Sequence, residues 1–287
     1  MVFVSAIEGN SQWLDGGAMF GNVPRALWQK WHQPDELGRI RLATRGLLIE
    51  DEASKIKVLC ETGVGNFFPP HLAKRYGVEN SDENLLLRNL HACGVSADEI
   101  NYVILSHLHF DHVGGLIAAD GALNFPNAHY LVGARALARA EQAHRRDHAS
   151  FIADLPSKLR SSKRLVLIEG ADDIPVKLRG KLEFIFTEGH TVGQMHVLWG
   201  ERHNKMFFAS DLIPGCAWVH LAITAGYDRY PELLIDEKQA LYERALQEKW
   251  LLFFMHDIDW VAAHIANEQG KYRAVDQMSS LSRYRFD

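Results

Sequence analysis

The sequence of 287 residues has little cysteine, no long apolar run and no excess of basic residues. Its three cysteines are scattered and form no Cys-x-x-Cys pair, so they fit a reducing compartment better than a disulfide framework. No apolar run approaches the roughly 18 residues of a membrane span, and the first residues lack the basic and apolar regions of a signal peptide. We therefore expect a cytoplasmic protein that does not enter a membrane.

Basic charge is also scarce, because 31 Lys and Arg residues stand against 36 Asp and Glu residues, a net charge of −5. Nucleic-acid binding usually needs an excess of Lys and Arg on one face, so we expect no nucleic-acid partner. The densest basic stretch covers residues 158–164 and lies beside Arg145 and Arg146 in the sequence. We interpret it as exposed surface, as charge runs of this kind usually are.

Glycine (22 residues) and proline (9) are too few for a low-complexity or fibrous chain, and no linker or repeat divides the sequence. We therefore expect one domain over residues 1–287. Histidine, in contrast, is abundant, with 15 residues against 14 phenylalanines and 8 tyrosines. Because histidine is neither a good core residue nor a typical surface residue, the excess calls for a chemical role.

The pattern of apolar residues predicts many strands with helices between them, which is typical of an α/β (α+β) chain with stacked sheets flanked by helices. Helices are predicted over residues 82–93, 134–144 and 233–249 and from 261 onward. Strands are predicted over residues 2–7, 40–49, 55–61, 102–105, 130–132, 165–168, 182–186, 196–199, 206–209 and 251–255.

The segment Ser106 to Gly115 reads SHLHFDHVGG and directly follows the predicted strand 102–105. His107 and His109 are two residues apart, so in an extended backbone both rings point to the same side. Asp111 and His112 follow where the chain leaves the sheet. Imidazole and carboxylate ligands suit a borderline divalent ion such as zinc, and four of them within six residues predict a two-metal site.

Four residues cannot complete two coordination spheres, so further ligands must come from elsewhere in the chain. His190, Asp211 and His256 each follow a different predicted strand, in the segments TEGHT, SDLIP and MHD. Three strands that each end at a ligand-type residue are typical of a site built along one edge of a sheet sandwich.

These motifs, in this order, resemble the metallo-β-lactamase superfamily, and the resemblance extends from the strand at residue 55 to His256. It implies an αββα sandwich of two mixed sheets flanked by helices. It also implies two zinc ions per chain, although other divalent metals suit such ligands. By resemblance, His107, His109 and His190 would hold one metal, Asp111, His112 and His256 the other, and Asp211 would bridge both.

Within the superfamily, the chain is more similar to the N-acyl-homoserine lactonase and methyl parathion hydrolase branch than to the other branches. The segments that carry this similarity are Leu14 to Trp28, Asp211 to Pro214, His220, Tyr227-Asp228, Pro231 and Lys238. The resemblance implies a quorum-quenching lactonase that opens N-acyl-homoserine lactones. We expect residues 1–36 to form an N-terminal arm that borders the active site.

Two positions depart from the family pattern. Glu61-Thr62-Gly63 stands where members often have Asp-Thr-Gly, and Pro214 stands where the best-known lactonases have a tyrosine. The phenol that would polarise the substrate carbonyl must come from elsewhere or be replaced, and we expect Tyr227 or His220 to bind substrate. The departure bears on the substrate and not on the hydrolytic chemistry.

The mechanism that we expect is attack by a hydroxide shared between two zinc ions about 3.5–4 Å apart. One metal would polarise an ester-like carbonyl of a small-molecule substrate, the other would stabilise the leaving alkoxide, and Asp111 would carry the proton. The sequence leaves the acyl-chain preference and a homodimer open.

Other functions use the same metal set. A glyoxalase-II-like thioesterase and an organophosphate or phosphoester hydrolase are the nearest alternatives, and a non-catalytic binding protein on this fold is an alternative of another class. All seven ligand positions are filled, which argues against the last. Nine further histidines have no motif around them and are interpreted as surface or core residues: His32, His71, His91, His129, His144, His148, His196, His203 and His264.

Overall fold

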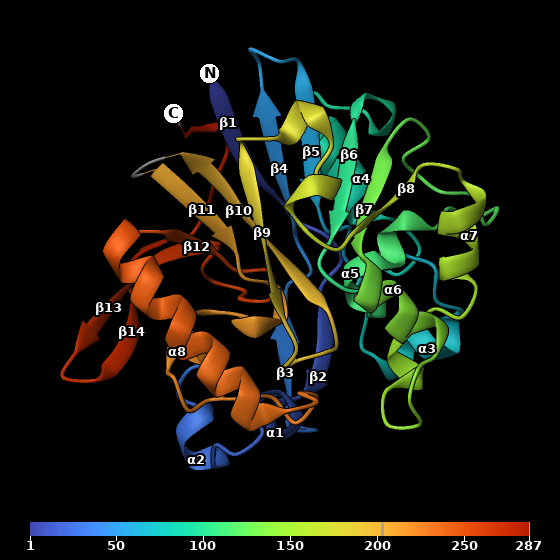
Figure 1. Ribbon diagram of the computed structural model, residues 1–287. Helices are drawn as coiled ribbons and strands as arrows, with labels where there is room; N and C mark the ends of the chain where they lie inside the picture. The colour runs from blue at the N-terminus through green and yellow to red at the C-terminus, as the bar shows by residue number, and fades with distance from the viewer. Residues whose placement is uncertain (202–203, 287) are drawn as a thin grey trace.

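The computed structural model describes residues 1–201 and 204–286, so His203 lies outside the described residues. Two sheets pack face to face with helices on both outer faces (Figure 1), which confirms the predicted mixed α/β sandwich. The first sheet has the strand order β15-β1-β4-β5-β6-β7-β8. Its strands are β1 Val2–Ile7, β4 Gly46–Asp51, β5 Ile56–Cys60, β6 Tyr102–Leu105, β7 His129–Gly133, β8 Leu165–Ile168 and β15 Tyr284–Arg285.

The second sheet has the order β14-β13-β12-β11-β10-β9. Its strands are β9 Leu182–Thr187, β10 Gln194–Glu201, β11 Asn204–Phe208, β12 Leu251–Phe253, β13 Ala262–Glu268 and β14 Lys271–Met278. A separate two-stranded sheet pairs β2 (Gln12–Asp15), which lies in the N-terminal arm, with β3 (Arg39–Leu42), which follows the arm. The α-helices are α1 Gly16–Phe20, α2 Arg25–Trp28, α3 Pro70–Arg75, α4 Leu85–Ala92, α5 Phe110–Val113, α6 Ala134–Glu141, α7 Leu155–Ser161 and α8 Pro231–Glu248.

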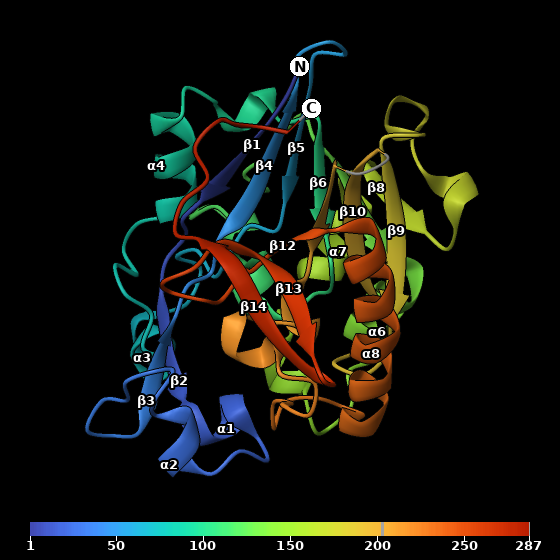
Figure 2. The same ribbon diagram turned by 90° about the vertical axis from the view of Figure 1, so that its left-hand side faces the viewer.

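The sandwich has three apolar layers because successive residues of a strand face opposite sides of a sheet. In β4, Leu47 and Ile49 join the core between the two sheets, whereas Leu48 joins the core under α4, α6 and α7. In β11, Phe208 faces the first sheet and Phe207 faces α8. Strands buried on both faces explain the continuous apolar runs in the sequence. Figure 2 shows α4 and α8 on opposite sides of the strands.

The single strand predicted over residues 40–49 is wrong, because it is two strands in different sheets. β3 pairs with β2 of the arm, and β4 pairs with β1 and β5. The chain leaves both ladders between them, where the backbone N–H of Ala43 donates to His256 O at 3.1 Å and the Thr44 hydroxyl donates to Asn10 O at 2.6 Å. Tertiary hydrogen bonds therefore divide a run that looks continuous in the sequence.

The helix predicted from residue 261 onward is also wrong, because this segment forms the β13–β14 hairpin. Gln269 and Gly270 both have positive φ, at 54° and 84°, and a turn of this hand matches the twist of two antiparallel strands. Ala263 and Ile265 alternate into the core against α8. The sheet partner therefore outweighs the helical propensity of the Ala and Glu residues. Within the described part of the chain, no helix is both long and apolar enough to cross a bilayer.

Candidate metal centre

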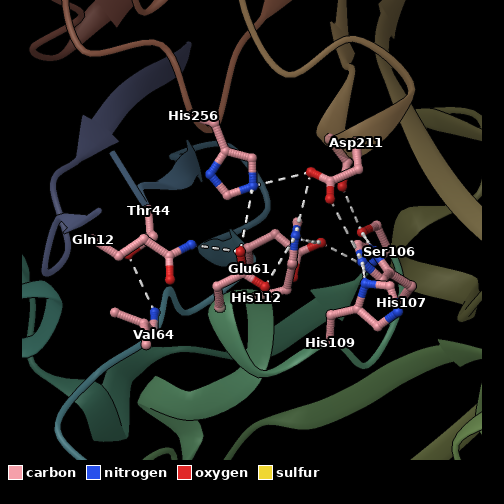
Figure 3. A network of polar contacts seen from close by, with 12 residues as sticks. Gln12, Thr44, Glu61, Val64, Ser106, His107, His109, His112, Asp211 and His256 are labelled. Carbon is pink, nitrogen blue, oxygen red and sulfur yellow. Dashed lines mark hydrogen bonds and ion pairs between the residues drawn. The ribbon is translucent and has the colours of Figure 1, made fainter. Parts of the chain in front are cut away.

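All seven predicted ligand residues meet at one edge of the sandwich, as Figure 3 shows for five of them. The loop after β6 carries His107 and His109, and α5 carries Asp111 and His112. The other three follow one strand each: His190 follows β9, Asp211 follows β11 and His256 follows β12. The two sheets thus contribute ligands from strands that end at the same edge.

The first group combines three imidazoles with one carboxylate. His109 Nδ1 lies 3.0 Å from His107 Nε2 and 3.2 Å from His190 Nε2. His190 Nε2 lies 3.2 Å from Asp211 Oδ2, and His107 Nε2 lies 4.0 Å from the same oxygen. All four ligand atoms lie within 4.8 Å of one another, which is the spacing of ligands around one ion.

The second group consists of Asp111, His112 and His256, and it faces the other oxygen of Asp211. His256 Nε2 lies 3.0 Å and His112 Nε2 lies 3.3 Å from Asp211 Oδ1. Both nitrogens lie 3.8 Å from an oxygen of Asp111. Asp211 therefore turns one oxygen toward each group, which is the arrangement that a carboxylate shared by two cations requires.

The burial and hydrogen bonding of these atoms fit divalent cations. Both ring nitrogens of His112 and the Oδ1 of Asp211 are buried without a hydrogen-bond partner. Buried polar atoms of this kind are costly unless a ligand or an ion satisfies them. Burial, reinforced by the neighbouring imidazoles, lowers the pKa of His107 far below its ordinary value and the pKa of His109 to about 3, so both rings are neutral and keep a lone pair for a metal.

A surrounding layer of residues orients the imidazoles. The Ser106 hydroxyl lies 2.9 Å from His107 Nδ1, and His256 Nδ1 donates to Ala43 O at 2.7 Å. His190 Nδ1 donates to the Asp228 carboxylate at 2.8 Å. Hydrogen bonds of this kind fix which nitrogen of a histidine faces the metal. Asp228 was noted in the sequence only as part of a family motif, and its contact across 38 residues was not predicted.

Glu61 lies behind the second group and not among its predicted ligands. The carboxylate is fully buried, accepts a hydrogen bond from the backbone N–H of Ser106 at 2.8 Å and lies 3.7 Å from His112 Nδ1. Since the Nε2 of His112 faces Asp211, the Glu61 carboxylate lies on the opposite side of the ring. The Glu61 side chain, which is longer than that of the family Asp, thus contacts the loop and the ring that carry candidate ligand atoms.

The N-terminal arm reaches the centre through Gln12, which the sequence did not single out. The Gln12 side chain is fully buried and donates from Nε2 to Asp111 Oδ2 at 2.7 Å. Leu14 and Met19 of the arm line the cavity beside the centre. Because 99 residues separate Gln12 from Asp111, no local pattern indicates their contact. The family resemblance of the arm was the one sequence feature that placed this segment near the site.

A cavity of about 380 Å³ opens onto the ligand groups and contains His109, Asp111, His190, Asp211 and His256 in its wall. Tyr227 and Pro214 line this cavity, together with Tyr76 and Phe110. His220 lies elsewhere. It lines a separate cavity of about 240 Å³, where its ring centre is 5.5 Å from that of Trp31. Of the two predicted substrate-binding residues, only Tyr227 is thus brought to the metal-ligand groups.

Two groups of potential metal ligands share a carboxylate at the edge of an αββα sandwich, beside a cavity, and form a candidate two-metal centre. Residues 51–256 match the sequence profile of the metallo-beta-lactamase superfamily, and the chain belongs to that superfamily. The resemblance inferred from the sequence is confirmed.

Lactonases are among the proteins to which the chain is similar. The N-acyl homoserine lactonase AiiA of Bacillus thuringiensis subsp. kurstaki is 26% identical over 191 residues, which cover 62% of this chain and 64% of the relative. The chain thus spans just under two thirds of the length of the curated relatives that it matches.

Solved structures share the fold over nearly the whole chain. A probable metal-dependent hydrolase from Staphylococcus aureus gives a TM-score of 0.84 at 24% identity, covering 96% of this chain and 98% of that one. AidC, a dizinc quorum-quenching lactonase solved with a product, gives 0.73 at 18% identity, covering 96% and 94%.

Proposed function

We propose that the chain is a lactonase that binds two zinc ions and opens N-acyl-homoserine lactones. The observation that carries this proposal is the division of the two Asp211 oxygens between two groups of ligands beside a cavity with apolar walls. The lactonases among its relatives and structural neighbours support the substrate class. A cytoplasmic location and a homodimer stay predictions.

The residues that would hold one ion are His107, His109, His190 and Asp211, and those that would hold the other are Asp111, His112, His256 and Asp211. Bound ions would supply a lowered pKa of coordinated water and polarisation of a carbonyl oxygen. Asp211 keeps the two groups adjacent. Asp111 is 13% exposed and lines the cavity, so its carboxylate can take up and release a proton at the oxygens that face the substrate.

The hydrogen bond from Gln12 fixes the Asp111 carboxylate for this role. Because Gln12 donates to Oδ2, that oxygen is held against the arm and Oδ1 stays on the side of His112. A carboxylate in one fixed orientation loses no free energy to reorientation when the proton moves. The arm thereby becomes part of the site.

The walls of the cavity suit the two parts of an acyl-homoserine lactone. Leu14, Met19 and Phe110 form an apolar wall for an acyl chain. Tyr227 presents a phenol to the same cavity, and burial, followed by the charge of Asp111, raises the pKa of this phenol. The phenol therefore stays protonated and can donate to a substrate carbonyl, in place of the family tyrosine that is absent at Pro214.

The test is hydrolysis of N-acyl-homoserine lactones of several chain lengths by the zinc-loaded protein, followed by liquid chromatography of the ring-opened product. We expect turnover by the wild type and by His91→Ala, which changes an exposed histidine of α4, and loss of turnover in His109→Ala and Asp211→Asn. A thioester and an aryl phosphotriester are assayed in parallel. Turnover of either one without any lactone opening would refute the lactonase and favour that alternative.

A further inference from the structure

The cavity beside the metal-ligand groups has one charged side chain that neither metal binding nor packing explains. Arg146 lies in the loop between α6 and the short 3-10 helix His148–Ser150, and it lines the same cavity as Asp211 and His256. Its Nη2 donates to the backbone carbonyl of Gly226 at 2.8 Å, and Gly226 lines the cavity as well. The guanidinium is therefore held between two loops that both border the substrate space.

The positive charge of Arg146 is not neutralised by the protein. Asp147, the other charged residue of this loop in the cavity wall, forms an ion pair with Arg139. Within residues 1–201 and 204–286, no ion pair includes Arg146, whose partner is the neutral Gly226 carbonyl. A guanidinium has five N–H donors, and this contact uses one, so four remain available.

An unpaired guanidinium in a binding cavity favours an anionic ligand group. Arginine binds carboxylates and phosphates with two parallel hydrogen bonds, which are stronger than bonds between neutral groups. Two divalent ions held by five imidazoles and two carboxylates would add positive charge to the same cavity, and so would not repel an anion. The wall of Leu14, Met19 and Phe110 suits an apolar remainder of the ligand.

We propose that Arg146 selects substrates in which an apolar acyl chain ends in a negatively charged group, with a carboxylate as the best fit. This proposal rests on the proposed function, because it assigns the substrate class of the same site. Arg145 and Arg146 are both exposed, and of the two only Arg146 lines the cavity.

The experiment compares pairs of homoserine lactones that differ at the end of the acyl chain. Butanoyl, hexanoyl and octanoyl lactones are matched with succinyl, adipoyl and suberoyl lactones, in which a carboxylate replaces the terminal methyl group. For the wild type we expect kcat/KM to be at least about tenfold higher for the charged member of one or more pairs. A preference for the neutral member at every length would overturn the proposal.

Variants of the two neighbouring arginines test whether Arg146 causes the preference for charged substrates. Arg146→Gln should lower the ratio of charged to neutral kcat/KM by about tenfold, and Arg146→Lys should lower it less because the charge remains. Arg145→Gln is the matched control, since Arg145 is exposed like Arg146 but lies outside the cavity wall, and it should leave the ratio unchanged. Equal ratios in Arg146→Gln and Arg145→Gln would contradict the proposal.

A binding measurement with compounds that are not hydrolysed tests the role of Arg146 independently of the lactonase activity. The matching lactams are measured by calorimetry with the zinc-loaded protein. Tighter binding of the adipoyl than of the hexanoyl lactam, lost in Arg146→Gln, supports the role of Arg146 even if no lactone is opened. Equal binding of both lactams, together with lactone turnover, overturns the role of Arg146 and leaves the lactonase intact.

Discussion

The carboxylate of Asp228 holds His190 from behind, because its Oδ1 accepts a hydrogen bond from His190 Nδ1 at 2.8 Å. Its Oδ2 accepts the backbone N–H of Ala225 at 2.6 Å, so the carboxylate is itself fixed. With Nδ1 bound in this way, Nε2 of His190 faces Asp211 Oδ2 at 3.2 Å. An acid that binds no metal thus determines the direction of a ligand atom.

Replacing Asp228 with Asn keeps the shape of the side chain and removes its charge. We expect zinc affinity to fall about 10–100-fold, because residues that orient metal-binding histidines contribute this much. Competition with a chromogenic chelator measures the affinity. Asp236→Asn, an exposed acid of α8, is the control and should bind zinc like the wild type. Unchanged affinity in Asp228→Asn would show that the charge of Asp228 has no role in metal binding.

Replacing Gln12 with Ala removes the donor that fixes Asp111 at 2.7 Å. We expect kcat to fall about 10- to 100-fold, since a hydrogen bond to a charged group contributes about 1.5–3 kcal/mol, while KM changes less. Gln29→Ala changes an exposed glutamine of the same arm and serves as the control. A rise in KM alone would mean that Gln12 shapes the substrate space and not the proton carrier.

Removing metal should destabilise the fold, because a bound ion would satisfy buried atoms of His112 and Asp211 that have no hydrogen-bond partner. Chelation is expected to lower the Tm and readdition of zinc to restore it, with about 2.7 kcal/mol of stabilisation at 100-fold excess over Kd. Scanning calorimetry measures both steps. Asp211→Asn should show a much smaller response to zinc. Identical Tm values with and without chelator would contradict a metal centre here.

Lys238 on α8 is fully buried and donates from Nζ to the carbonyls of Trp218, His220 and Ile223, at 2.7, 2.9 and 3.0 Å. Lys238→Met should lower the free energy of unfolding by about 2–4 kcal/mol, because these acceptors lose their donor inside the protein. Urea unfolding measures the loss, and the exposed Lys177→Met should lie within about 0.5 kcal/mol of the wild type. A similar midpoint for both variants would refute this role.

The ion pair of Asp51 with Lys181 should make the stability of the fold depend on pH. Burial raises its pKa, but hydrogen bonds from Lys181 and Ser54 outweigh burial and lower the pKa to about 2. A pKa below the ordinary value of 3.8 stabilises the fold above that pH, and the contribution is lost as the pH falls toward 2. The free energy of unfolding of the wild type should exceed that of Asp51→Asn by about 1 kcal/mol near neutral pH, after allowance for solvent screening. The gap should narrow in acid, and a gap that widens would contradict the assignment.

The clustering of the candidate metal ligands could be predicted because they lie in one short motif and at the ends of apolar strands. The layer behind them could not, because Gln12 and Asp228 act across 99 and 38 residues and lie in segments without periodicity. Local composition also misled at residues 261 onward, where the neighbouring strand β12 decides the structure. Each candidate ligand can be recognised from the few residues around it, whereas its orientation depends on partners that are distant in the sequence.

The shared carboxylate of Asp211 has a consequence for how the centre fills. Since one side chain serves both groups of ligands, an ion in either group fixes the rotamer that the other group meets. The two positions are therefore coupled, and occupancy of each changes the affinity of the other by the same factor. Titration with metal should follow a linked binding curve and not the sum of two independent ones.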